Sequence, residues 1–266
     1  MSKILLVGAG HMGKALLKSW VKNNIKKISI IDPKLAIKNK EIYRIKVFKT
    51  LKEIKNINTY SVIFFAIKPQ IINEVLDTYK KLELKNKLIL SIVAGKNINF
   101  FEKKLGKNIS IIRTMPNMPA SIEKGVTCLF PNKNVNLKQK KFSDKLFKSV
   151  GKTFWVNNEN YINKFTAISG SGPAYYYYFI ECLRDAAVKL GISNNLSYEI
   201  AKETAIGSIN LLENSKENAT TMRKRIAIKG GTTEAAINAL KVNKKMQKVV
   251  YSGVKAAFKK AIKIGK

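Results

Sequence analysis

The sequence has very few of the residues on which several enzyme classes depend. It contains one histidine, His11, so a zinc site built from two histidines is excluded, and a Ser-His-Asp hydrolase has only this residue to use. His11 lies within a glycine-rich turn as a tolerated spacer, and we expect neither histidine acid–base chemistry nor a metal site. Two cysteines, Cys128 and Cys182, argue against a disulfide framework, and apolar packing is the default role for both.

Long apolar runs are absent as well. The longest, residues 62–67 and 88–94, fall far short of the roughly 20 residues that a membrane helix needs. Residues 3–7 run directly into glycines instead of a signal-peptide cleavage site. We therefore expect a cytoplasmic protein with no membrane partner.

Acidic residues are scarce relative to basic ones. The chain has 17 Asp and Glu against 50 Lys and Arg, which gives a net charge of +33. Such a charge is typical of nucleic-acid binding, but only five of the fifty are arginine, the residue that contacts phosphates and bases with paired hydrogen bonds. The lysines are spread along the chain without a basic block, so we favour a solvated, lysine-rich surface and no nucleic-acid partner.

The first 160 residues alternate short apolar runs with helix-like stretches. Five nearly continuous apolar segments have the pattern of strands buried on both faces of a parallel sheet: 4–7, 28–31, 62–66, 88–93 and 109–112. Between them, stretches such as 11–23 and 71–82 place apolar residues at three- and four-residue spacing. This alternation predicts an α/β fold with a Rossmann-like doubly wound sheet.

From residue 161 onward the strand-like runs end. Apolar residues follow helical spacing in 179–190, 200–212 and 250–261. We therefore predict a dinucleotide-binding domain over 1–160 and an all-helical C-terminal domain over 161–266. The apolar stripes are generous for a unit of about a hundred residues, which indicates burial against a partner chain.

A G-x-G-x-x-G motif lies between the first predicted strand and the first predicted helix. Its residues are Gly8, Ala9, Gly10, His11, Met12 and Gly13. At this position the glycines permit a tight turn, close approach of the backbone to a pyrophosphate, and close packing of helix on strand. The helix N-terminus adds unpaired N–H groups, so we expect a dinucleotide site, with a plain glycine turn as the alternative.

Asp32 ends the second predicted strand, about 20 residues after the glycine motif, where an acid binds the ribose 2′-hydroxyl of NAD. An Asx turn that opens Asp32-Pro33 is the competing interpretation. Lys34 and Lys38 follow closely and are placed to accept the 2′-phosphate of NADP. The sequence therefore leans toward NADH and leaves NADPH open.

Four further motifs appear in order along the chain. They are Ala66-Ile67-Lys68-Pro69-Gln70, Arg113-Thr114-Met115-Pro116-Asn117-Met118-Pro119-Ala120, Ser169-Gly170-Ser171-Gly172-Pro173-Ala174-Tyr175 and Gly230-Gly231-Thr232-Thr233-Glu234. Together with the glycine turn, their order and spacing closely resemble pyrroline-5-carboxylate reductase, the last enzyme of proline biosynthesis. The resemblance covers essentially the whole chain.

The two motifs that end strands are expected to border the cofactor, because ligands of an open α/β sheet lie beyond the carboxyl ends of its strands. We place Ala66, Lys68 and Pro69 beside the nicotinamide half. Asn117 offers its amide to the nicotinamide or ribose. A surface lysine and a turn-forming asparagine are the alternatives for Lys68 and Asn117. Ser171 is expected to be the N-cap of the helix that follows it.

The glycine pair of the last motif precedes two threonines and a helical pattern, which predicts a helix N-terminus that receives an anion. The resemblance implies that Gly230, Gly231, Thr232 and Thr233 bind the substrate carboxylate. It also implies that Thr233, the catalytic candidate, contacts the ring nitrogen. Ile228-Lys229 stand where the family usually has Ser-Pro, which puts substrate affinity in question, and an ammonium contact from Lys229 is a hypothesis. A simple glycine cap is the alternative.

The resemblance implies hydride transfer from NADPH or NADH to the C=N carbon of L-Δ1-pyrroline-5-carboxylate, which gives L-proline. It also implies a homodimer with intertwined helical domains, with a ring of dimers as a larger assembly. Activity on six-membered cyclic imines is left open.

There are two alternatives, one within the dehydrogenases and one from a different class of protein. A two-domain 3-hydroxyacid dehydrogenase is disfavoured, because those enzymes use a lysine at the start of the long helix and this chain has none there before Lys189. A basic nucleic-acid-binding protein on a reductase scaffold is disfavoured by the intact glycine and threonine loops.

Overall fold

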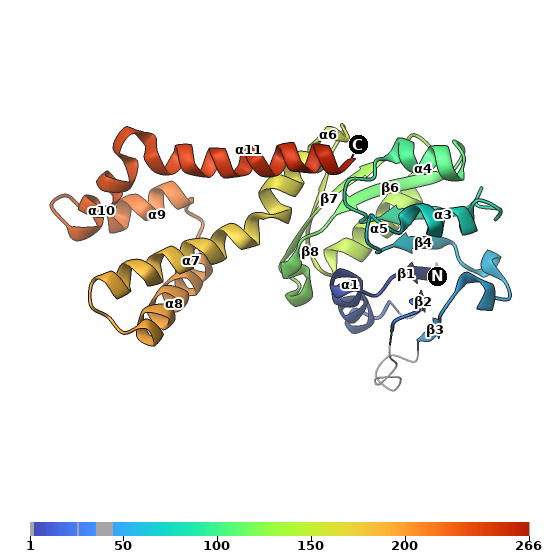
Figure 1. Cartoon of the computed structure of the whole chain (residues 1–266), viewed down its shortest axis with the longest axis horizontal. Helices are drawn as coiled ribbons and strands as arrows, with labels where there is room; N and C mark the ends of the chain where they lie inside the picture. Colours follow the sequence, from blue (N-terminus) through green and yellow to red (C-terminus); the bar gives the residue numbers. More distant parts are fainter. Residues whose placement is uncertain (1–2, 26, 36–44, 266) are drawn as a thin grey trace. The chain divides into compact units, whose positions relative to one another are not determined.

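The computed structural model describes residues 3–25, 27–35 and 45–265. It divides into two compact units: Met1–Ser171 with Ala257–Lys266, and Gly172–Ala256. The first unit contains a sheet covered by helices, and the second contains helices (Figure 1). The predicted fold class, a Rossmann-like sheet followed by a helical region, is confirmed.

The sheet of the first unit has the order β3-β2-β1-β4-β5-β6-β7-β8 among the described residues. The strands are β1 (Ile4–Val7), β2 (Ile28–Ile31), β3 (Lys46–Phe48), β4 (Val62–Phe65), β5 (Leu88–Ser91), β6 (Ser110–Met115), β7 (Gly125–Pro131) and β8 (Gly151–Trp155). Strands β1 to β6 are parallel, β7 is antiparallel to β6, and β8 is parallel to β7. After β3 the chain crosses to the other half of the sheet and continues with β4 beside β1, so the switch point where such sheets bind ligands lies between β1 and β4.

The five predicted strands are β1, β2, β4, β5 and β6, and their bounds lie close to those expected. The sequence pattern missed β3, β7 and β8. Strand β3 is three residues long, and β8 alternates half-buried and exposed positions instead of presenting a continuous apolar run. These strands lie at or next to the edges of the sheet, where burial on both faces is not required.

Helices cover both faces of the sheet, as the alternation of side chains along each strand requires (Figure 1). α1 (His11–Lys22) and α5 (Leu137–Lys148) share one core cluster with Ile4, Leu6, Leu16, Trp20, Leu146 and Phe147. α3 (Ile72–Tyr79) and α4 (Ile98–Leu105) share the other with Leu5, Val7, Ile72, Leu76 and Phe101. The expected helices over 11–23 and 71–82 correspond to α1 and α3.

The stretch after β8 belongs to the first unit. It contains α6 (Asn160–Phe165) and a π-helical turn (Thr166–Gly170), in which Ile162 and Ala167 are buried. The sequence texture predicted a boundary at 160/161, whereas the compact units divide at 171/172 because this stretch packs on the sheet. Ser171 has helical backbone angles, φ −84° and ψ −20°, instead of the extended angles of an N-cap, so its expected capping geometry is wrong.

The second unit consists of α7 (Gly172–Lys189), α8 (Asn194–Glu213), α9 (Ala219–Ile226), α10 (Thr232–Lys241) and the first turns of α11 (Lys245–Gly265). Among its described residues, Gly172, Ser197 and Ala201 are buried. Large apolar side chains are exposed instead, including Tyr176, Tyr177, Tyr178, Leu190, Ile209, Leu211, Val249 and Tyr251. The apolar faces of this unit are therefore left uncovered by the chain itself.

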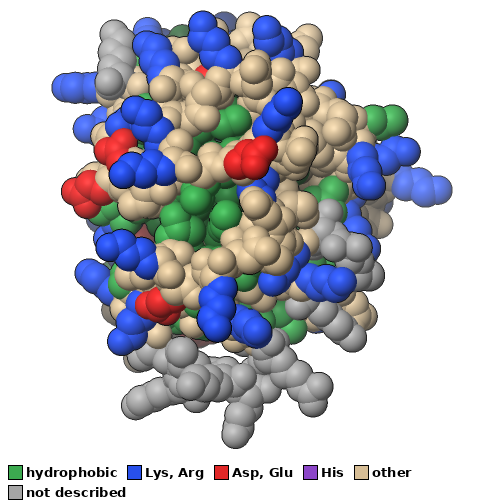
Figure 2. Space-filling view, turned by 90° about the vertical axis from the view of Figure 1, so that its right-hand side faces the viewer, with side chains coloured by type: hydrophobic (Ala, Val, Ile, Leu, Met, Phe, Trp, Pro, Cys, Tyr) green, Lys and Arg blue, Asp and Glu red, His purple; other side chains and the backbone are tan. Residues whose placement is uncertain are grey.

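The surface carries many basic side chains. Figure 2 shows lysines and arginines scattered over one face of the molecule, with acidic side chains between them. None of the helices in the part of the chain that the structure describes is long and apolar enough to span a membrane.

Candidate functional site

The glycine turn after β1 is packed so tightly that its first residue must be glycine. Gly8 has φ +93°, and a Cβ built on it would lie 2.6 Å from the Ala66 carbonyl oxygen. Its N–H donates to the Ile31 carbonyl at 2.8 Å, and the Ala66 N–H donates to the Val7 carbonyl at 2.8 Å. The turn is thus held against the ends of β2 and β4 at the switch point of the sheet.

The other two glycines of the motif differ in their surroundings. A Cβ on Gly13 would lie 2.5 Å from the Gly8 carbonyl oxygen, so this glycine lets α1 pack directly on the turn. A Cβ on Gly10 would meet no atom within 4 Å. Gly10 therefore faces open space, as a residue does where a ligand approaches the backbone.

Gly10 is also the N-cap residue of α1, and the first turn of this helix contains no acidic side chain. The helical hydrogen bonds begin with the Lys14 N–H, which donates to the Gly10 carbonyl. The N–H groups of His11, Met12 and Gly13 have no carbonyl one turn earlier in the helix to which they could donate. The open space in front of Gly10, together with these donors, fits the pyrophosphate of a dinucleotide.

Asp32 joins the end of β2 to the glycine turn. Its Oδ2 accepts a hydrogen bond from the Ala9 N–H at 2.7 Å, and its Oδ1 accepts one from the Lys34 N–H at 2.8 Å. The second bond is the Asx turn that the sequence offered as an alternative. Residues 8–13 form what we call the glycine cradle. Asp32 lies beside this cradle, as a ribose ligand must, but its contact with a ribose stays a prediction. Lys34 is exposed, and Lys38 lies outside the described residues.

The turn after β4 lies next to the glycine turn, as expected for Ala66, Lys68 and Pro69. Ala66 contacts Gly8 directly, and Lys68 is exposed with its carbonyl accepting from the Ile71 N–H. The structure thus brings the glycine motif, Asp32 and the β4 turn together at the carboxyl ends of the neighbouring strands β2, β1 and β4. Their roles toward a cofactor remain predictions.

Asn117, at the end of β6, is buried and already engaged by the protein. Its Nδ2 donates to the Ser169 carbonyl at 2.9 Å, and its Oδ1 accepts from the Val126 N–H at 2.8 Å. These bonds tie the β6 turn to β7 and to the π-helical turn. Asn117 therefore stabilises this turn, which is close to the turn-forming role that the sequence offered as an alternative. Its contact with the nicotinamide stays a prediction.

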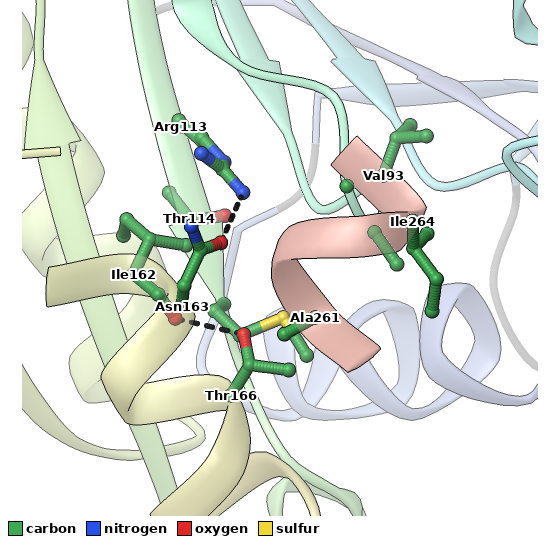
Figure 3. A pocket seen from close by; sticks show the side chains of 11 residues that line it. Val93, Arg113, Thr114, Ile162, Asn163, Thr166, Ala261 and Ile264 are labelled. Carbon is green, nitrogen blue, oxygen red and sulfur yellow. Dashed lines mark hydrogen bonds between the residues drawn. The ribbon is translucent and has the colours of Figure 1, made fainter. Parts of the chain in front are cut away.

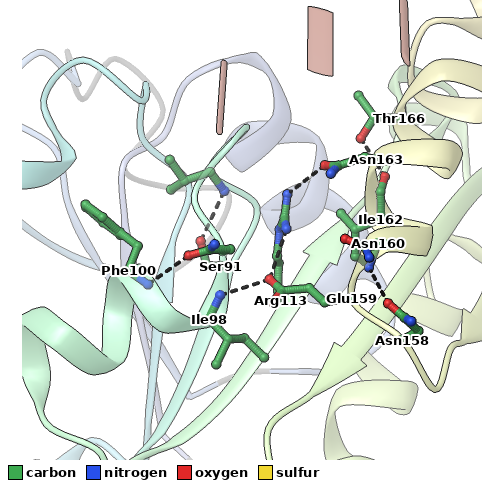
Figure 4. A network of polar contacts seen from close by, with 12 residues as sticks. Ser91, Ile98, Phe100, Arg113, Asn158, Glu159, Asn160, Ile162, Asn163 and Thr166 are labelled. Carbon is green, nitrogen blue, oxygen red and sulfur yellow. Dashed lines mark hydrogen bonds and ion pairs between the residues drawn. The ribbon is translucent and has the colours of Figure 1, made fainter. Parts of the chain in front are cut away.

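Arg113 opens the motif over residues 113–120, and the sequence pattern assigned it no role. It is buried in β6, and its guanidinium bonds Glu159 and Asn163 (Figure 4). Figure 3 shows the small cavity beside it, which Thr114, Ile162, Thr166 and Ile264 also line. The cavity measures about 30 Å³, enough for about one water and far too small for a cofactor. A lone arginine within an apolar strand was the signal that could have identified this network.

In the second unit, Gly231 is the N-cap of α10, so the predicted helix start is confirmed. Gly230 has φ +77°, and the Gly231 N–H donates to the Ile228 carbonyl at 3.1 Å. Glu234, in the first turn of α10, accepts a hydrogen bond from the Gly230 N–H at 2.8 Å. The sequence had not identified this brace, which shapes the loop that precedes Thr232 and Thr233.

The two cysteines differ in their exposure to solvent. Cys128 is buried, and desolvation raises the pKa of its thiol to about 12, although the nearby Arg113 opposes the rise, so the thiol stays protonated at neutral pH. Cys182 is exposed on α7. Within the described ranges, no group of histidine, cysteine, aspartate or glutamate side chains is arranged to hold a metal ion.

Two family models match this chain, one in the helical region and one in the region of the sheet. A family model described as pyrroline-5-carboxylate reductase dimerisation matches residues 159–264, and one described as NADP oxidoreductase, coenzyme F420-dependent, matches residues 3–95. A pyrroline-5-carboxylate reductase of Haemophilus influenzae is 30% identical over 237 residues, which span 88% of this chain and 87% of that relative.

Solved structures give the same result over the full length. The pyrroline carboxylate reductase of Plasmodium falciparum with NADP bound is 31% identical, has a TM-score of 0.84, and covers 100% of this chain and 98% of its own. A pyrroline-5-carboxylate reductase of Coxiella burnetii is 29% identical, has a TM-score of 0.90, and covers 100% and 99%. These similarities give no support to the 3-hydroxyacid dehydrogenase alternative.

Proposed function

The chain belongs to the pyrroline-5-carboxylate reductase family, and on this premise we propose how its own residues carry out the reaction. The enzyme reduces L-Δ1-pyrroline-5-carboxylate to L-proline with NAD(P)H, the last step of proline biosynthesis. The observation that carries the assignment of the cofactor site is the glycine cradle. In it, Gly8 and Gly13 are sealed against protein atoms while Gly10 faces open space.

The residues around the cradle would hold the cofactor. Gly10, His11, Met12 and Gly13 present backbone N–H groups to the pyrophosphate at the start of α1. Asp32 would bind the ribose of NADH, and the exposed Lys34 would bind the 2′-phosphate of NADPH; the contact of Asp32 with the glycine turn supports this. A relative of this chain has NADP bound, and both forms of the cofactor fit this set of residues.

The turns after β4 and β6 would position the nicotinamide. Ala66, Lys68 and Pro69 follow β4, and Asn117 follows β6, so both turns lie at the carboxyl edge of the sheet. The bound nicotinamide supplies the hydride, while the protein supplies orientation and electrostatic environment. Holding donor and acceptor carbons in line is where most of the rate originates.

The loop at the start of α10 would bind the substrate. The N–H groups of Gly230 and Gly231 are held by Glu234 and Ile228, so these glycines would shape the loop around the carboxylate. The N–H groups of Thr232 and Thr233 at the start of α10, with the Thr232 hydroxyl, would bind the carboxylate, and the helix dipole favours an anion there. Thr233 would accept a hydrogen bond from the protonated imine nitrogen through its hydroxyl oxygen. The imine is basic enough to arrive protonated, so no strong general acid is needed, in keeping with a chain that has one histidine.

The protein forms a homo-oligomer through its helical region. The dimerisation model covers residues 159–264, and the uncovered apolar side chains of α7, α8 and α11 supply the surface. An intertwined dimer, a ring of dimers and a cytoplasmic location belong to the proposal.

Steady-state turnover of Thr233→Ala and Thr233→Ser tests the catalytic role. We expect Thr233→Ala to lower kcat by about 10²-fold, because general acid–base and orienting groups contribute on that order, and to leave cofactor affinity unchanged. Thr233→Ser keeps the hydroxyl and should retain most of the activity. Equal activity of the two variants, both near wild type, would remove Thr233 from the mechanism.

A further inference from the structure

Arg113 is a buried cation near the carboxyl end of β6, and its side chain is 7% exposed. Its Nη1 lies 2.9 Å from Oε1 of Glu159, and its Nη2 donates to Oδ1 of Asn163 at 3.3 Å. Both partners come from the stretch that follows β8, so the guanidinium ties that stretch to the sheet (Figure 4). Burial makes this charge depend on its partners, because an unpaired buried charge is strongly unfavourable.

The carboxylate of Glu159 performs two tasks with one oxygen. Besides pairing with Arg113, Oε1 accepts a hydrogen bond from the Ile98 N–H at 2.9 Å. Ile98 is the first residue of α4, and the preceding Asn97 caps the same helix by accepting from the Phe100 N–H. One side chain therefore connects β6, the N-terminus of α4 and the start of α6.

The elements joined in this way surround the strand ends at which the nicotinamide is expected. Strand β5 lies between β4 and β6, so its turn, residues 92–97, separates the turn that contains Ala66 from the turn that contains Asn117. Thr114 donates to the Ser91 carbonyl at 3.1 Å and joins the ends of β5 and β6. The cavity beside Arg113 is too small to admit cofactor or substrate, so the guanidinium acts through the backbone it holds.

We propose that the Arg113–Glu159 ion pair is a positioning device for hydride transfer. It fixes the turns after β5 and β6 at the distance and angle that the nicotinamide requires. The proposal rests on the reductase function proposed above. Neither residue touches the reacting atoms, so both are positioning residues, and their loss is expected to affect kcat more than the affinity for either reactant.

Glu159→Gln tests the proposal with little change in shape. Glutamine keeps an oxygen for the Ile98 N–H but leaves Arg113 without a counter-charge. We expect kcat to fall by about tenfold or more, because displacements below 1 Å at a hydride-transfer site have effects of this order. The KM values for NAD(P)H and for pyrroline-5-carboxylate should stay within about threefold. The primary isotope effect on kcat with C4-deuterated cofactor should rise, because the chemical step becomes rate-limiting.

Two further variants keep the test decisive. Asn163→Ala removes a neutral acceptor and preserves the ion pair, so it is a matched control and should lose much less kcat than Glu159→Gln. The double variant Arg113→Gln with Glu159→Gln removes both charges and leaves no unpaired buried charge, so it serves if Glu159→Gln alone is unstable. Asp77→Asn breaks the exposed Lys104–Asp77 pair between α3 and α4, away from the strand ends, and should leave kcat unchanged.

The outcomes separate this inference from the function on which it rests. An unchanged kcat and isotope effect in the folded Glu159→Gln variant, or in the folded double variant, beside an active wild type, would overturn the positioning role alone, even if thermal stability fell. A wild type without turnover would overturn the proposed function and this inference with it.

Discussion

At the scale of single residues, Asp32 links cofactor selectivity to the glycine cradle. Its carboxylate is held in place by the Ala9 and Lys34 N–H groups, so its negative charge has a fixed position next to the proposed ribose site. A fixed charge of this sign favours a 2′-hydroxyl and opposes a 2′-phosphate. The exposed Lys34 ammonium has the opposite preference, and we propose that the balance between the two sets the choice of cofactor.

Asp32→Asn should shift selectivity toward NADPH. Asparagine can still accept one of the two N–H bonds, whereas the charge that repels the phosphate is gone. We expect the ratio of kcat/KM for NADPH to that for NADH to rise by about tenfold, since one charge contact is worth on the order of 1–2 kcal/mol. Lys34→Met is the matched variant and should lower kcat/KM for NADPH while sparing NADH. A ratio that stays constant in both variants would remove them from cofactor selection.

At the scale of elements, the β1 turn and α1 form a unit in which the three glycines have different tasks. The packing shows that Gly8 and Gly13 are required by the fold. A Cβ on Gly10, by contrast, would meet no atom within 4 Å, and Gly10 has φ −66°, which any residue adopts. The fold therefore does not require glycine at this position, and we propose that the ligand does.

Gly10→Ala and Gly13→Ala should separate ligand binding from folding. A methyl group on Gly10 occupies the space of the pyrophosphate, so the KM for NAD(P)H should rise by about tenfold or more while the melting temperature stays near that of wild type. A methyl group on Gly13 meets the Gly8 carbonyl oxygen and should destabilise the protein by about 1–3 kcal/mol. Thermal unfolding combined with cofactor titration measures both effects. Normal cofactor binding by Gly10→Ala would refute the cradle.

The elements show how far a single sequence predicts this fold and where prediction ends. Continuous apolar runs identified β1, β2, β4, β5 and β6, because both faces of those strands are buried and the pattern is local. Strands β7 and β8 were not predicted because they lie at or next to one side of the sheet, where half-buried and exposed positions interrupt the apolar run. Helix α9 escaped because it is mostly polar and has no buried residue.

The candidate site shows the same limit. The glycine motif and the start of α10 were predictable because each is a short segment whose chemistry is local. The Arg113–Glu159 pair and the two bonds of the Asn117 side chain were not, because they join residues that only the folded chain brings together.

At the scale of the whole molecule, the helical unit has an apolar surface that its own chain does not cover. Leu211 and Val249 are 60% and 73% exposed, in a unit in which few side chains are buried. Exposed apolar area of this extent is typical of an obligate interface, in which the fold and the assembly stabilise each other.

Leu211→Asp combined with Val249→Asp should prevent assembly. Two carboxylates in an apolar interface have no counter-charge, so the molar mass measured by light scattering should fall to that of one chain, and turnover should fall by about tenfold or more. Ile122→Asp, at an exposed apolar residue of the first unit, is the control and should leave the mass unchanged. An unchanged mass in the double variant would place the interface on other helix faces.

The measurement that tests the central claim most directly follows the hydride itself. Pyrroline-5-carboxylate is incubated with the enzyme and NADPH or NADH carrying deuterium at both C4 positions, and the proline is analysed by mass spectrometry. Hydride transfer from the nicotinamide to the imine carbon predicts proline with one deuterium on Cδ, the ring carbon next to nitrogen that does not carry the carboxylate. Unlabelled proline, or no proline with either cofactor, would contradict the reductase account.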